Sequence, residues 1–231
     1  MSSAAEAAVA VVIPAFRAAH TIGEVVTRAL AAVPGATVVV VDDGSGDATA
    51  ARARAAGADV ARHETNRGKG AALATGLAAA VARAGIRHVV TLDADGQHPP
   101  ERIGALLEPL RRGEADLVIG ARRRDAAVMP AGRRFTNWLS STLVTRALRQ
   151  GVPDSQSGFR AMCRPVAERV RPTGARYEYE TEFLFLAGAE GFRIRAVEIP
   201  TVYGGMPSHF RHVGDTARIA RVILRYWRRL V

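Results

Sequence analysis

The stretch that decides the fold of this chain is His88-Val89-Val90-Thr91-Leu92-Asp93-Ala94-Asp95-Gly96-Gln97. Its first half is rich in apolar and β-branched residues, which predicts a buried strand over 88–92 that runs directly into Asp93. In parallel α/β sheets, ligands bind beyond the carboxyl ends of the strands, so acidic residues placed there indicate a binding site. Residues i and i+2 of an extended segment point the same way, and Asp93 and Asp95 can therefore address one ligand or ion.

The segments on both sides of this stretch alternate between strand-like and helix-like patterns. Strands are predicted over residues 9–13, 37–41, 60–62 and 116–120, and helices over 19–32, 48–56, 70–84 and 103–111. Pro14 is expected to end the first strand, because proline is tolerated at the end of a strand and not in its middle. The second half is less regular, with helices predicted over 133–149, 179–187 and 213–230 and a strand over 194–199. Continuous apolar strands separated by helices favour an α/β fold with a mostly parallel central sheet flanked by helices.

The length and composition suit a single domain. The chain has 231 residues, of which 48% are hydrophobic and 23% charged, as in an ordinary soluble globular protein. We find no linker or repeat that divides it, and no stretch reaches the roughly 20 uninterrupted apolar residues of a membrane span. Its single cysteine, Cys163, excludes an intramolecular disulfide, and residues 2–10 lack the basic start of a signal peptide. We therefore expect one domain over residues 1–231, in the cytoplasm.

The chain carries a large positive charge, +10 at pH 7, with a sequence pI of about 11.1. Its 32 basic residues are arginines except for Lys69. Such a charge attracts phosphate-bearing partners, which include nucleotides, anionic lipid surfaces and nucleic acid. Arginines on solvated faces would account for the same charge without any partner, so the charge does not choose between these classes.

Two acidic clusters directly follow predicted strands. Asp42-Asp43 comes after the second strand and Asp93-Ala94-Asp95 after the fourth. Carboxylate oxygens suit Mg²⁺ or Mn²⁺, which bind through one or two carboxylates and the phosphate oxygens of a substrate. Gln97 could add a neutral oxygen and His98 a nitrogen. An isolated Asp-x-Asp also fits a solvated turn, but its position after an apolar strand favours a site.

Several ordered motifs extend this pattern along the chain. They are Val12-Ile13-Pro14-Ala15-Phe16, Val40-Val41-Asp42-Asp43-Gly44-Ser45-Gly46-Asp47-Ala48-Thr49, Asn66-Arg67-Gly68-Lys69-Gly70-Ala71-Ala72-Leu73, Leu92-Asp93-Ala94-Asp95-Gly96-Gln97-His98-Pro99-Pro100, Asp154-Ser155-Gln156-Ser157-Gly158-Phe159-Arg160 and Tyr179-Glu180-Thr181-Glu182. In this order the motifs resemble the family-2 inverting glycosyltransferases, and most of all the branch of dolichyl and polyprenyl phosphate mannosyltransferases. The resemblance implies a GT-A fold. It further implies a nucleotide-sugar-binding half over about 9–120 and an acceptor-side half over about 121–212.

The resemblance also implies roles for particular residues. The nucleotide sugar would contact Pro14, Phe16, Val40, Asp42, Asp43, Lys69, Asp93, Ala94, Asp95, Arg122, His209 and Arg211. Asp95 and Gln97 would bind Mg²⁺ or Mn²⁺, with Asp93 as a further ligand. Phe16 stands where the family usually has tyrosine, and Arg17-Ala18 stands where it usually has Asn-Glu, so the identity of the nucleotide stays open.

Basic residues in the second half are candidates for phosphate contacts. The resemblance places Arg122 near the reacting phosphates and His209 or Arg211 in a loop that closes over the donor diphosphate. Arg133-Arg134 could bind the acceptor phosphate, with a solvated arginine run as the alternative. The predicted basic helix over 213–231 has one apolar face, which would lie on an anionic membrane surface or pack on the core.

The chemistry of such a transfer agrees with these residues. A nucleoside diphosphate accumulates negative charge as it leaves the sugar, and a divalent cation together with Arg122 would stabilise that charge. A lipid phosphate acceptor is already ionised and needs no general base, whereas a sugar hydroxyl does. Asp154, Glu180 and Glu182 are the candidates for that base. Alternatively, the two glutamates are helix-surface acids or orient Arg160 and Arg176, and Asp154 caps a helix or turn. The candidate catalytic residues are thus Asp95, Arg122, Asp154 and Glu182.

One function is favoured over three alternatives. We expect a metal-dependent enzyme that moves a hexose, mannose or glucose first, from a GDP- or UDP-hexose to a polyprenyl phosphate at the cytoplasmic membrane face. Since no transmembrane segment is predicted, transfer to a soluble or glycan hydroxyl stays an alternative. A sugar nucleotidyltransferase would favour a glycine-rich, basic loop directly after the first strand, which Pro14-Ala15-Phe16-Arg17 is not. A nucleic-acid binder would have no use for Asp93 and Asp95, so we expect no nucleic-acid partner.

Overall fold

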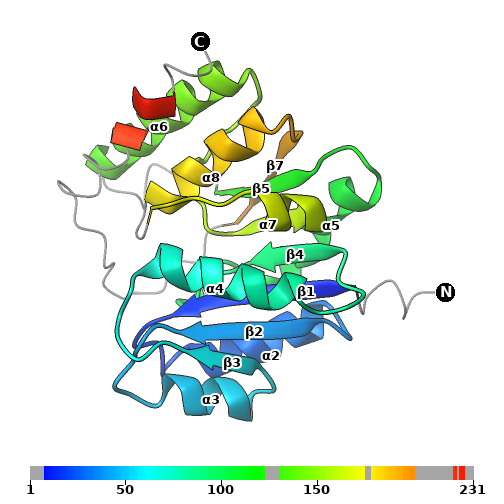
Figure 1. Ribbon diagram of the computed structural model, residues 1–231, viewed down its shortest axis with the longest axis vertical. Coiled ribbons are helices and arrows are strands. Elements are labelled where there is room, and N and C mark those ends of the chain that lie inside the picture. Colours follow the sequence, from blue (N-terminus) through cyan, green and yellow to red (C-terminus); the bar gives the residue numbers. More distant parts are fainter. Residues whose placement is uncertain (1–7, 123–130, 175–177, 201–220, 223, 227–231) are drawn as a thin grey trace.

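The computed structural model describes residues 8–122, 131–174, 178–200, 221, 222 and 224–226. These residues form a seven-stranded sheet in the order β3-β2-β1-β4-β6-β5-β7 (Figure 1). The strands are β1 (Val9–Ala15), β2 (Thr37–Asp42), β3 (Asp59–Arg62), β4 (His88–Thr91), β5 (Leu117–Arg122), β6 (Arg160–Cys163) and β7 (Ile194–Ile199). Strand β6 runs antiparallel to β4 and β5, and the other neighbouring strands are parallel. The expected mostly parallel sheet is therefore confirmed.

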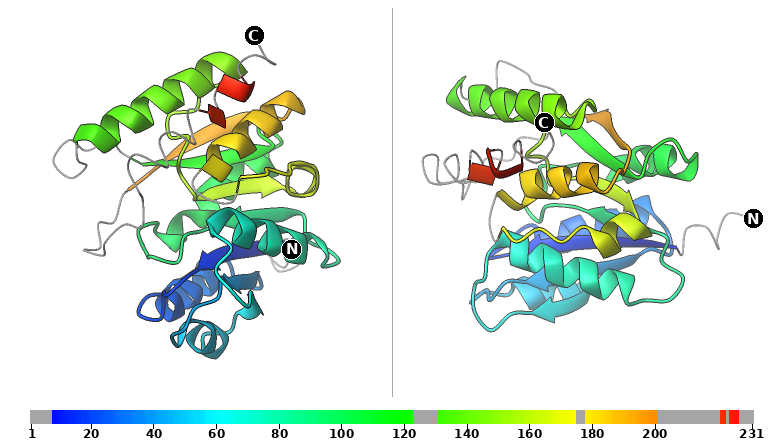
Figure 2. Two further views of the ribbon diagram at one scale, coloured as in Figure 1. Left: turned by 60° about the vertical axis from the view of Figure 1, so that its left-hand side comes forward. Right: turned by 45° about the horizontal axis from the view of Figure 1, so that its top comes forward.

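Helices cover both faces of the sheet. One face carries α2 (Ile22–Ala32), α3 (Thr49–Ala55), the short 3-10 helix η1 (Pro100–Arg102) and α5 (Ile103–Arg111). The other carries α4 (Lys69–Val81), α7 (Arg164–Arg169) and α8 (Glu178–Ala189). Helix α6 (Ala131–Leu148) packs on α8 and lies at one end of the molecule, as both views of Figure 2 show. Within the described part of the chain, no helix is long and apolar enough to cross a bilayer.

Strand β1 explains why the sheet needs cover on both faces. Val11 and Ile13 join the core cluster formed with α2 and α5, whereas Ala10 and Val12 join the cluster formed with α4 and α8. Successive side chains of a strand alternate between the two faces, so a strand covered on both is a continuous apolar run. All seven residues of β1 are buried. Such runs made the parallel strands predictable.

Pro14 lies inside β1 and does not end it, which corrects the predicted boundary. Strand β1 pairs with β4 only as far as Val12, but it pairs with β2 as far as Ala15. The backbone of Pro14 faces the same neighbour as that of Val12, because alternate residues of a strand share an orientation. The N–H that proline lacks would therefore face β4, where the ladder has already ended.

Three described elements were not predicted, the third being the 3-10 helix η1, and one prediction is covered only in part. Strand β6 and helix α7 are absent from the predicted set. The C-terminal helix predicted over 213–230 is described only at 221, 222 and 224–226, which are helical. Val222 and Tyr226 are buried there, and the Tyr226 ring stacks on Phe185 with centroids 5.6 Å apart. The apolar side of these residues thus packs on the core.

Candidate active site

The carboxyl ends of β1, β2 and β4 lie next to one another at one edge of the sheet (Figure 1). The register pairs Ala15 with Asp42, the last residues of β1 and β2. Strand β4 ends at Thr91, two residues before Asp93. The sheet therefore brings the two predicted acidic clusters to the same edge.

The carboxylate of Asp43 is buried and holds a turn. Its Oδ1 accepts the N–H of Arg67 at 2.9 Å and lies 2.7 Å from His63 Nδ1, and its Oδ2 accepts the N–H of Gly68 at 2.8 Å. The other ring nitrogen of His63 lies 3.0 Å from Thr75 Oγ1 on α4. Asp43 and His63 together fix the chain that enters α4.

Asp42 supports the loop that follows β1. Its Oδ1 accepts the N–H of Ser45 at 3.0 Å, and its Oδ2 lies 3.3 Å from Arg62 Nε. The Ser45 hydroxyl in turn accepts the N–H of Arg17 at 2.8 Å. Arg17 has a left-handed φ of 52°, and its guanidinium lies 5.2 Å from the centroid of the Phe16 ring. The residue that departs from the family pattern is thus stacked on the aromatic predicted to meet the nucleotide.

Lys69 joins the end of β4 to α8. Its Nζ lies 2.8 Å from Asp93 Oδ1 and 2.7 Å from Glu180 Oε1. Burial alone would lower the pKa of Lys69, but the two carboxylates outweigh burial and raise that pKa well above its usual range. Burial would likewise raise the pKa of Asp93, but Lys69 and His98, whose Nε2 lies 3.5 Å from Asp93 Oδ2, hold it well below its usual range. Asp93 is therefore an ionised, tightly held carboxylate.

Gly158 leaves the space that this ion pair occupies. A Cβ at position 158 would lie 2.6 Å from Asp93 Oδ1 and 2.9 Å from Lys69 Nζ, and real Cβ atoms do not approach other atoms so closely. The carbonyl of Gly158 also accepts the hydroxyl of Thr91 at 2.7 Å. A side chain at this position would have to displace the carboxylate or the ammonium.

Asp95 makes no ion pair within the described part of the chain, unlike Asp93. Its Oδ1 accepts the N–H of Gln97 at 2.9 Å. Burial and the neighbouring charge of Asp93 raise the pKa of Asp95 above its ordinary value. Among the described residues, no cluster of three or more His, Cys, Asp or Glu side chains forms a complete metal site. An uncompensated carboxylate beside an incomplete ligand set fits Mg²⁺ or Mn²⁺, which take further ligands from substrate phosphate and water.

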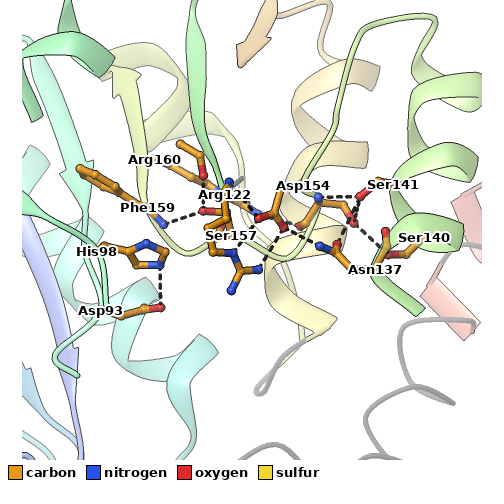
Figure 3. A network of polar contacts seen from close by, with 12 residues as sticks. Asp93, His98, Arg122, Asn137, Ser140, Ser141, Asp154, Ser157, Phe159 and Arg160 are labelled. Atoms are coloured by element: carbon orange, nitrogen blue, oxygen red, sulfur yellow. Dashed lines mark hydrogen bonds and ion pairs between the residues drawn. The ribbon is translucent and has the colours of Figure 1, made fainter. Parts of the chain in front are cut away.

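Arg122, at the end of β5, is held by a two-pronged ion pair with Asp154 (Figure 3). Its Nε donates to Oδ2 at 2.7 Å and its Nη2 donates to Oδ1 at 3.1 Å. Asn137 of α6 adds a hydrogen bond from Nδ2 to Oδ1 at 3.2 Å. Burial would raise the pKa of Asp154, but Arg122 outweighs burial and lowers it. Asp154 is therefore an ionised partner of Arg122. The role in a helix cap or turn that was considered for Asp154 is not its only role.

Glu182 is an anchor between segments. Its carboxylate accepts the N–H and hydroxyl of Thr173, both at 3.0 Å, the N–H of Gly174 at 2.8 Å and the hydroxyl of Tyr226 at 2.8 Å. The side chain is buried, and both of its oxygens are used. Glu182 thus ties α8 to the chain before it and to the C-terminal segment.

Arg160 occupies the interior next to these acids. Its Nε donates to the carbonyl of Ser157 at 2.9 Å and its Nη2 to the carbonyl of Ser155 at 3.1 Å. Burial lowers the pKa of Arg160. Glu180 was considered as a residue that orients Arg160, but its ion pair is made with Lys69.

The other predicted residues are buried or lie outside the described part of the chain. Val40 lies two residues before the end of β2 and is fully buried in the core, and Pro14 is buried within β1. Ala94 is buried, and its carbonyl accepts the hydroxyl of Thr21 at 2.7 Å. The side chains of Arg133 and Arg134, and the whole of His209 and Arg211, lie outside the described residues.

Sequence reasoning missed three residues that shape the site. His63 holds the turn before α4, Gly158 makes room for Asp93, and Asn137 binds Asp154. Gly158 lies in a quoted motif, so a signal for it existed. His63 and Asn137 lie outside every motif, and their partners are distant in sequence.

Comparisons with known proteins identify the family. The family described as Glycosyl transferase family 2 matches residues 10–171. The undecaprenyl-phosphate mannosyltransferase of Micrococcus luteus is 32% identical over 203 residues, which cover 83% of this chain and 82% of that protein. The polyprenol monophosphomannose synthase of Mycolicibacterium smegmatis is 34% identical over 211 residues, which cover 84% of this chain and 76% of that protein.

A solved structure has the same fold. It is the glucosyl-3-phosphoglycerate synthase of Mycobacterium tuberculosis in complex with Mn²⁺, uridine diphosphate and phosphoglyceric acid. The TM-score is 0.75 at 25% identity, with 97% of this chain and 81% of that chain covered. The GT-A fold implied by the motifs is confirmed. With its strand-end carboxylates and this match over most of its length, the chain belongs to glycosyl transferase family 2 and is a glycosyltransferase.

Proposed function

We propose that this enzyme transfers a hexose, with inversion, from a nucleotide diphosphate sugar to a polyprenyl phosphate at the cytoplasmic membrane face. The observation that supports a phosphate acceptor is that the acidic side chains considered as bases are already paired. A hydroxyl acceptor must lose a proton to a general base, whereas a phosphate acceptor arrives already ionised. The acids of the site therefore discriminate between the two acceptor classes.

The acids considered as bases are already engaged. Asp154 is bound in a two-pronged ion pair, and Glu182 accepts four hydrogen bonds. Glu180 is 2% exposed and pairs with the same ammonium as Asp93. Asp95, by contrast, makes no ion pair within the described part of the chain, so its charge is left to be compensated by a cation. Such a set supports an acceptor that brings its own negative charge.

The relatives support a lipid carrier. The names of the two proteins compared above contain undecaprenyl phosphate and polyprenol, and one is named a mannosyltransferase and the other a monophosphomannose synthase. A mannose donor such as GDP-mannose is consistent with these names, and UDP-glucose is consistent with the uridine diphosphate in the structural neighbour.

The donor would lie across the ends of β1, β2 and β4. Asp95 and Gln97 would hold Mg²⁺ or Mn²⁺, with Asp93 beside them. Bound there, the cation would supply positive charge that stabilises the leaving diphosphate. Arg122, whose side chain is 20% exposed and fixed in one orientation by Asp154, would place a second positive charge near the phosphates. The role of Lys69 would be to hold Asp93 in position.

A small phosphorylated acceptor is the second candidate. The observation that favours it is the fold match over 97% of this chain to a protein solved with phosphoglyceric acid. This acceptor carries phosphate and carboxylate charge but is soluble. It would leave the donor side of the proposal unchanged.

A transfer assay with three matched acceptors tests the proposal. Radiolabelled GDP-mannose, UDP-glucose and UDP-N-acetylglucosamine are each incubated with Mn²⁺ or Mg²⁺ and with a short polyprenyl phosphate, the corresponding polyprenol, or phosphoglyceric acid. We expect product with polyprenyl phosphate and none with polyprenol, which differs only in lacking the phosphate. Equal transfer to polyprenol would refute the argument from the engaged bases. Product with phosphoglyceric acid alone would select the second candidate.

A matched pair of variants tests the donor side. Asp95→Asn should abolish transfer, whereas Asp59→Asn should retain it. Asp59 is a 64% exposed acid at the start of β3, at the opposite edge of the sheet. Full transfer by Asp95→Asn, or full transfer by the wild type without a divalent cation, would contradict the metal assignment.

A further inference from the structure

Over residues 137–141, helix α6 buries polar side chains and exposes apolar ones, whereas further along it Val144 and Ala147 are buried in the core. Asn137, Ser140 and Ser141 are buried, whereas Trp138 is 49% and Leu139 is 41% exposed. The apolar side chains at 138 and 139 are thus turned outward, next to polar neighbours that are buried. Buried polar groups and exposed large apolar groups are the informative departures from ordinary burial. The outer side of this helix therefore needs an explanation.

The buried polar side chains on the inner side of α6 bind residues next to the site. Asn137 binds Asp154, the Ser140 hydroxyl lies 3.0 Å from the hydroxyl of Ser155, and the Ser141 hydroxyl accepts the N–H of Ser155 at 3.0 Å (Figure 3). These bonds satisfy polar groups that would otherwise be buried without partners. They fix the rotation of the helix, and Trp138 and Leu139 consequently face outward.

The exposed apolar side chains lie among arginines. Trp138, Leu139 and Leu224 are the exposed large hydrophobic residues of the described part of the chain, and Leu224 is 64% exposed. Leu224 lies between Arg221 and Arg225, which are exposed too. Helix α6 carries the exposed Arg146 and contains no Asp or Glu over residues 131–148. This surface is thus apolar and positively charged, without acids on α6 to balance the charge.

The two parts of this surface are supported by the same helix. Helix α6 packs on α8, and the C-terminal segment packs on α8 through the stacked rings of Tyr226 and Phe185. Both parts lie at the same end of the molecule in the two views of Figure 2. The inward side of the C-terminal segment is committed to the core, so its outward residues, Leu224 and the arginines, are those available to a partner.

We propose that this surface, formed by Trp138, Leu139, Arg146, Arg221, Leu224 and Arg225, docks the enzyme on an anionic lipid bilayer. Tryptophan and leucine would enter the headgroup boundary, where an amphipathic ring and a branched alkyl chain are favourable. The arginines would contact anionic headgroups. Such a surface carries charge complementary to the lipid and apolar side chains that water does not favour.

The purpose of this docking rests on the proposed function, which it deepens. An open groove of about 650 Å³ is lined by Trp138 and Arg146 from the docking surface, by Arg122 from the site, and by one acid, Glu198 of β7. A phosphate lipid could keep its chain in the bilayer while its phosphate lies along this groove. The inner side of α6 would then organise the site while its outer side contacts the membrane that holds the acceptor.

Vesicle binding without donor or acceptor tests the surface itself. The full chain is sedimented with vesicles of phosphatidylcholine, with and without phosphatidylglycerol. We expect binding to the anionic vesicles only, a loss of about tenfold in the partition constant for Trp138→Ser with Leu139→Ser, and about fivefold for Arg146→Gln. The matched control is Arg54→Gln, which removes an exposed arginine from α3 at the other end of the molecule. Equal losses in Arg146→Gln and Arg54→Gln would overturn the proposal.

Fluorescence locates the contact. The chain has two tryptophans, so Trp227→Phe leaves Trp138 as the only one. We expect anionic vesicles with brominated acyl chains to quench its emission. Vesicle binding without quenching would overturn the proposal, and so would self-association of the chain that is lost in Trp138→Ser with Leu139→Ser. Failure to bind vesicles together with transfer to polyprenyl phosphate in detergent would reject the docking surface and leave the proposed function standing.

Discussion

Replacing Lys69 by methionine removes the ammonium that lies between Asp93 and Glu180. Its Nζ is 2.8 and 2.7 Å from the two carboxylates, and the three side chains are 23, 22 and 3% exposed. At an effective dielectric constant of about 20, each contact corresponds to roughly 6 kcal/mol of Coulomb attraction, most of which offsets the cost of taking the charges out of water. Without the ammonium, two nearby carboxylates lose that compensation. We expect the free energy of unfolding at pH 7 to fall by about 3–5 kcal/mol.

Urea unfolding followed by circular dichroism measures this loss. With a slope of about 2 kcal/mol per molar urea, the midpoint should fall by about 2 M. The control is Arg83→Met, which removes a cation from the more exposed ion pair with Asp59 and should cost about 1 kcal/mol or less. Adding Glu180→Gln to Lys69→Met removes one uncompensated charge and should restore part of the stability, so the two substitutions should not be additive.

The pH dependence gives an independent check. In the wild type the pKa of Asp93 is depressed, so its stabilisation is present above the unfolded pKa and is lost only when pH falls through the folded value, well below the usual range. In Lys69→Met, burial would raise the carboxyl pKa values of the folded state above those of the unfolded state. The folded variant would then bind more protons, and its deficit should shrink between pH 7 and pH 5. A deficit below about 1 kcal/mol at pH 7, or strict additivity with Glu180→Gln, would refute this reasoning.

Three further substitutions probe other parts of the site. Asp95→Asn should lower turnover at least about 100-fold. Because the pKa of Asp95 is raised, the apparent Mn²⁺ affinity of the wild type should weaken as pH falls, at a higher pH than an ordinary carboxylate would require; an affinity unchanged down to pH 4 would contradict this. Gly158→Ala should cost about 1–3 kcal/mol in thermal or urea unfolding, because its Cβ would lie 2.6 Å from a carboxylate oxygen, while Gly104→Ala, with open space around its Cβ, should not destabilise the protein. Tyr226→Phe should cost about 1.5–3 kcal/mol through loss of the 2.8 Å hydrogen bond to Glu182, and an unchanged urea midpoint would exclude that anchor.

Most of the sheet could be predicted because its strands are short apolar runs that end at marked residues. β1 and β2 are recognisable in this way, and the acids after β2 and β4 mark the site edge. Strand β6 was missed because Arg160-Ala161-Met162-Cys163 is short and begins with a charged residue. Its burial comes from strands β4 and β5 on either side, which lie far away in sequence. Pro14 was misjudged because the neighbouring ladder ends before it, and that end is a property of the register.

The chemistry of the site was more predictable than its connections. Asp93 and Asp95 were identified together, but the sequence does not tell which of the two carboxylates forms an ion pair with a basic side chain. Lys69 and Glu180 lie in separate motifs, and their ion pair with Asp93 depends on how α4 and α8 pack against β4. The acids that were considered as bases are instead paired with other side chains and backbone groups. The sequence did not show this, because burial and pairing depend on tertiary packing.

The position of β6 has a consequence for synthesis of the chain on the ribosome. Strand β4 is complete at Thr91, but its neighbour β6 is complete only at Cys163. At about 5–20 residues per second, the emerging sheet β3-β2-β1-β4 waits roughly 4–14 s with those N–H and C=O groups of β4 that face β6 unpaired. Such an edge is a template for pairing with another nascent chain. A fragment cut after residue 120 would keep that edge for its lifetime, so the nucleotide-sugar half should aggregate when it is produced alone.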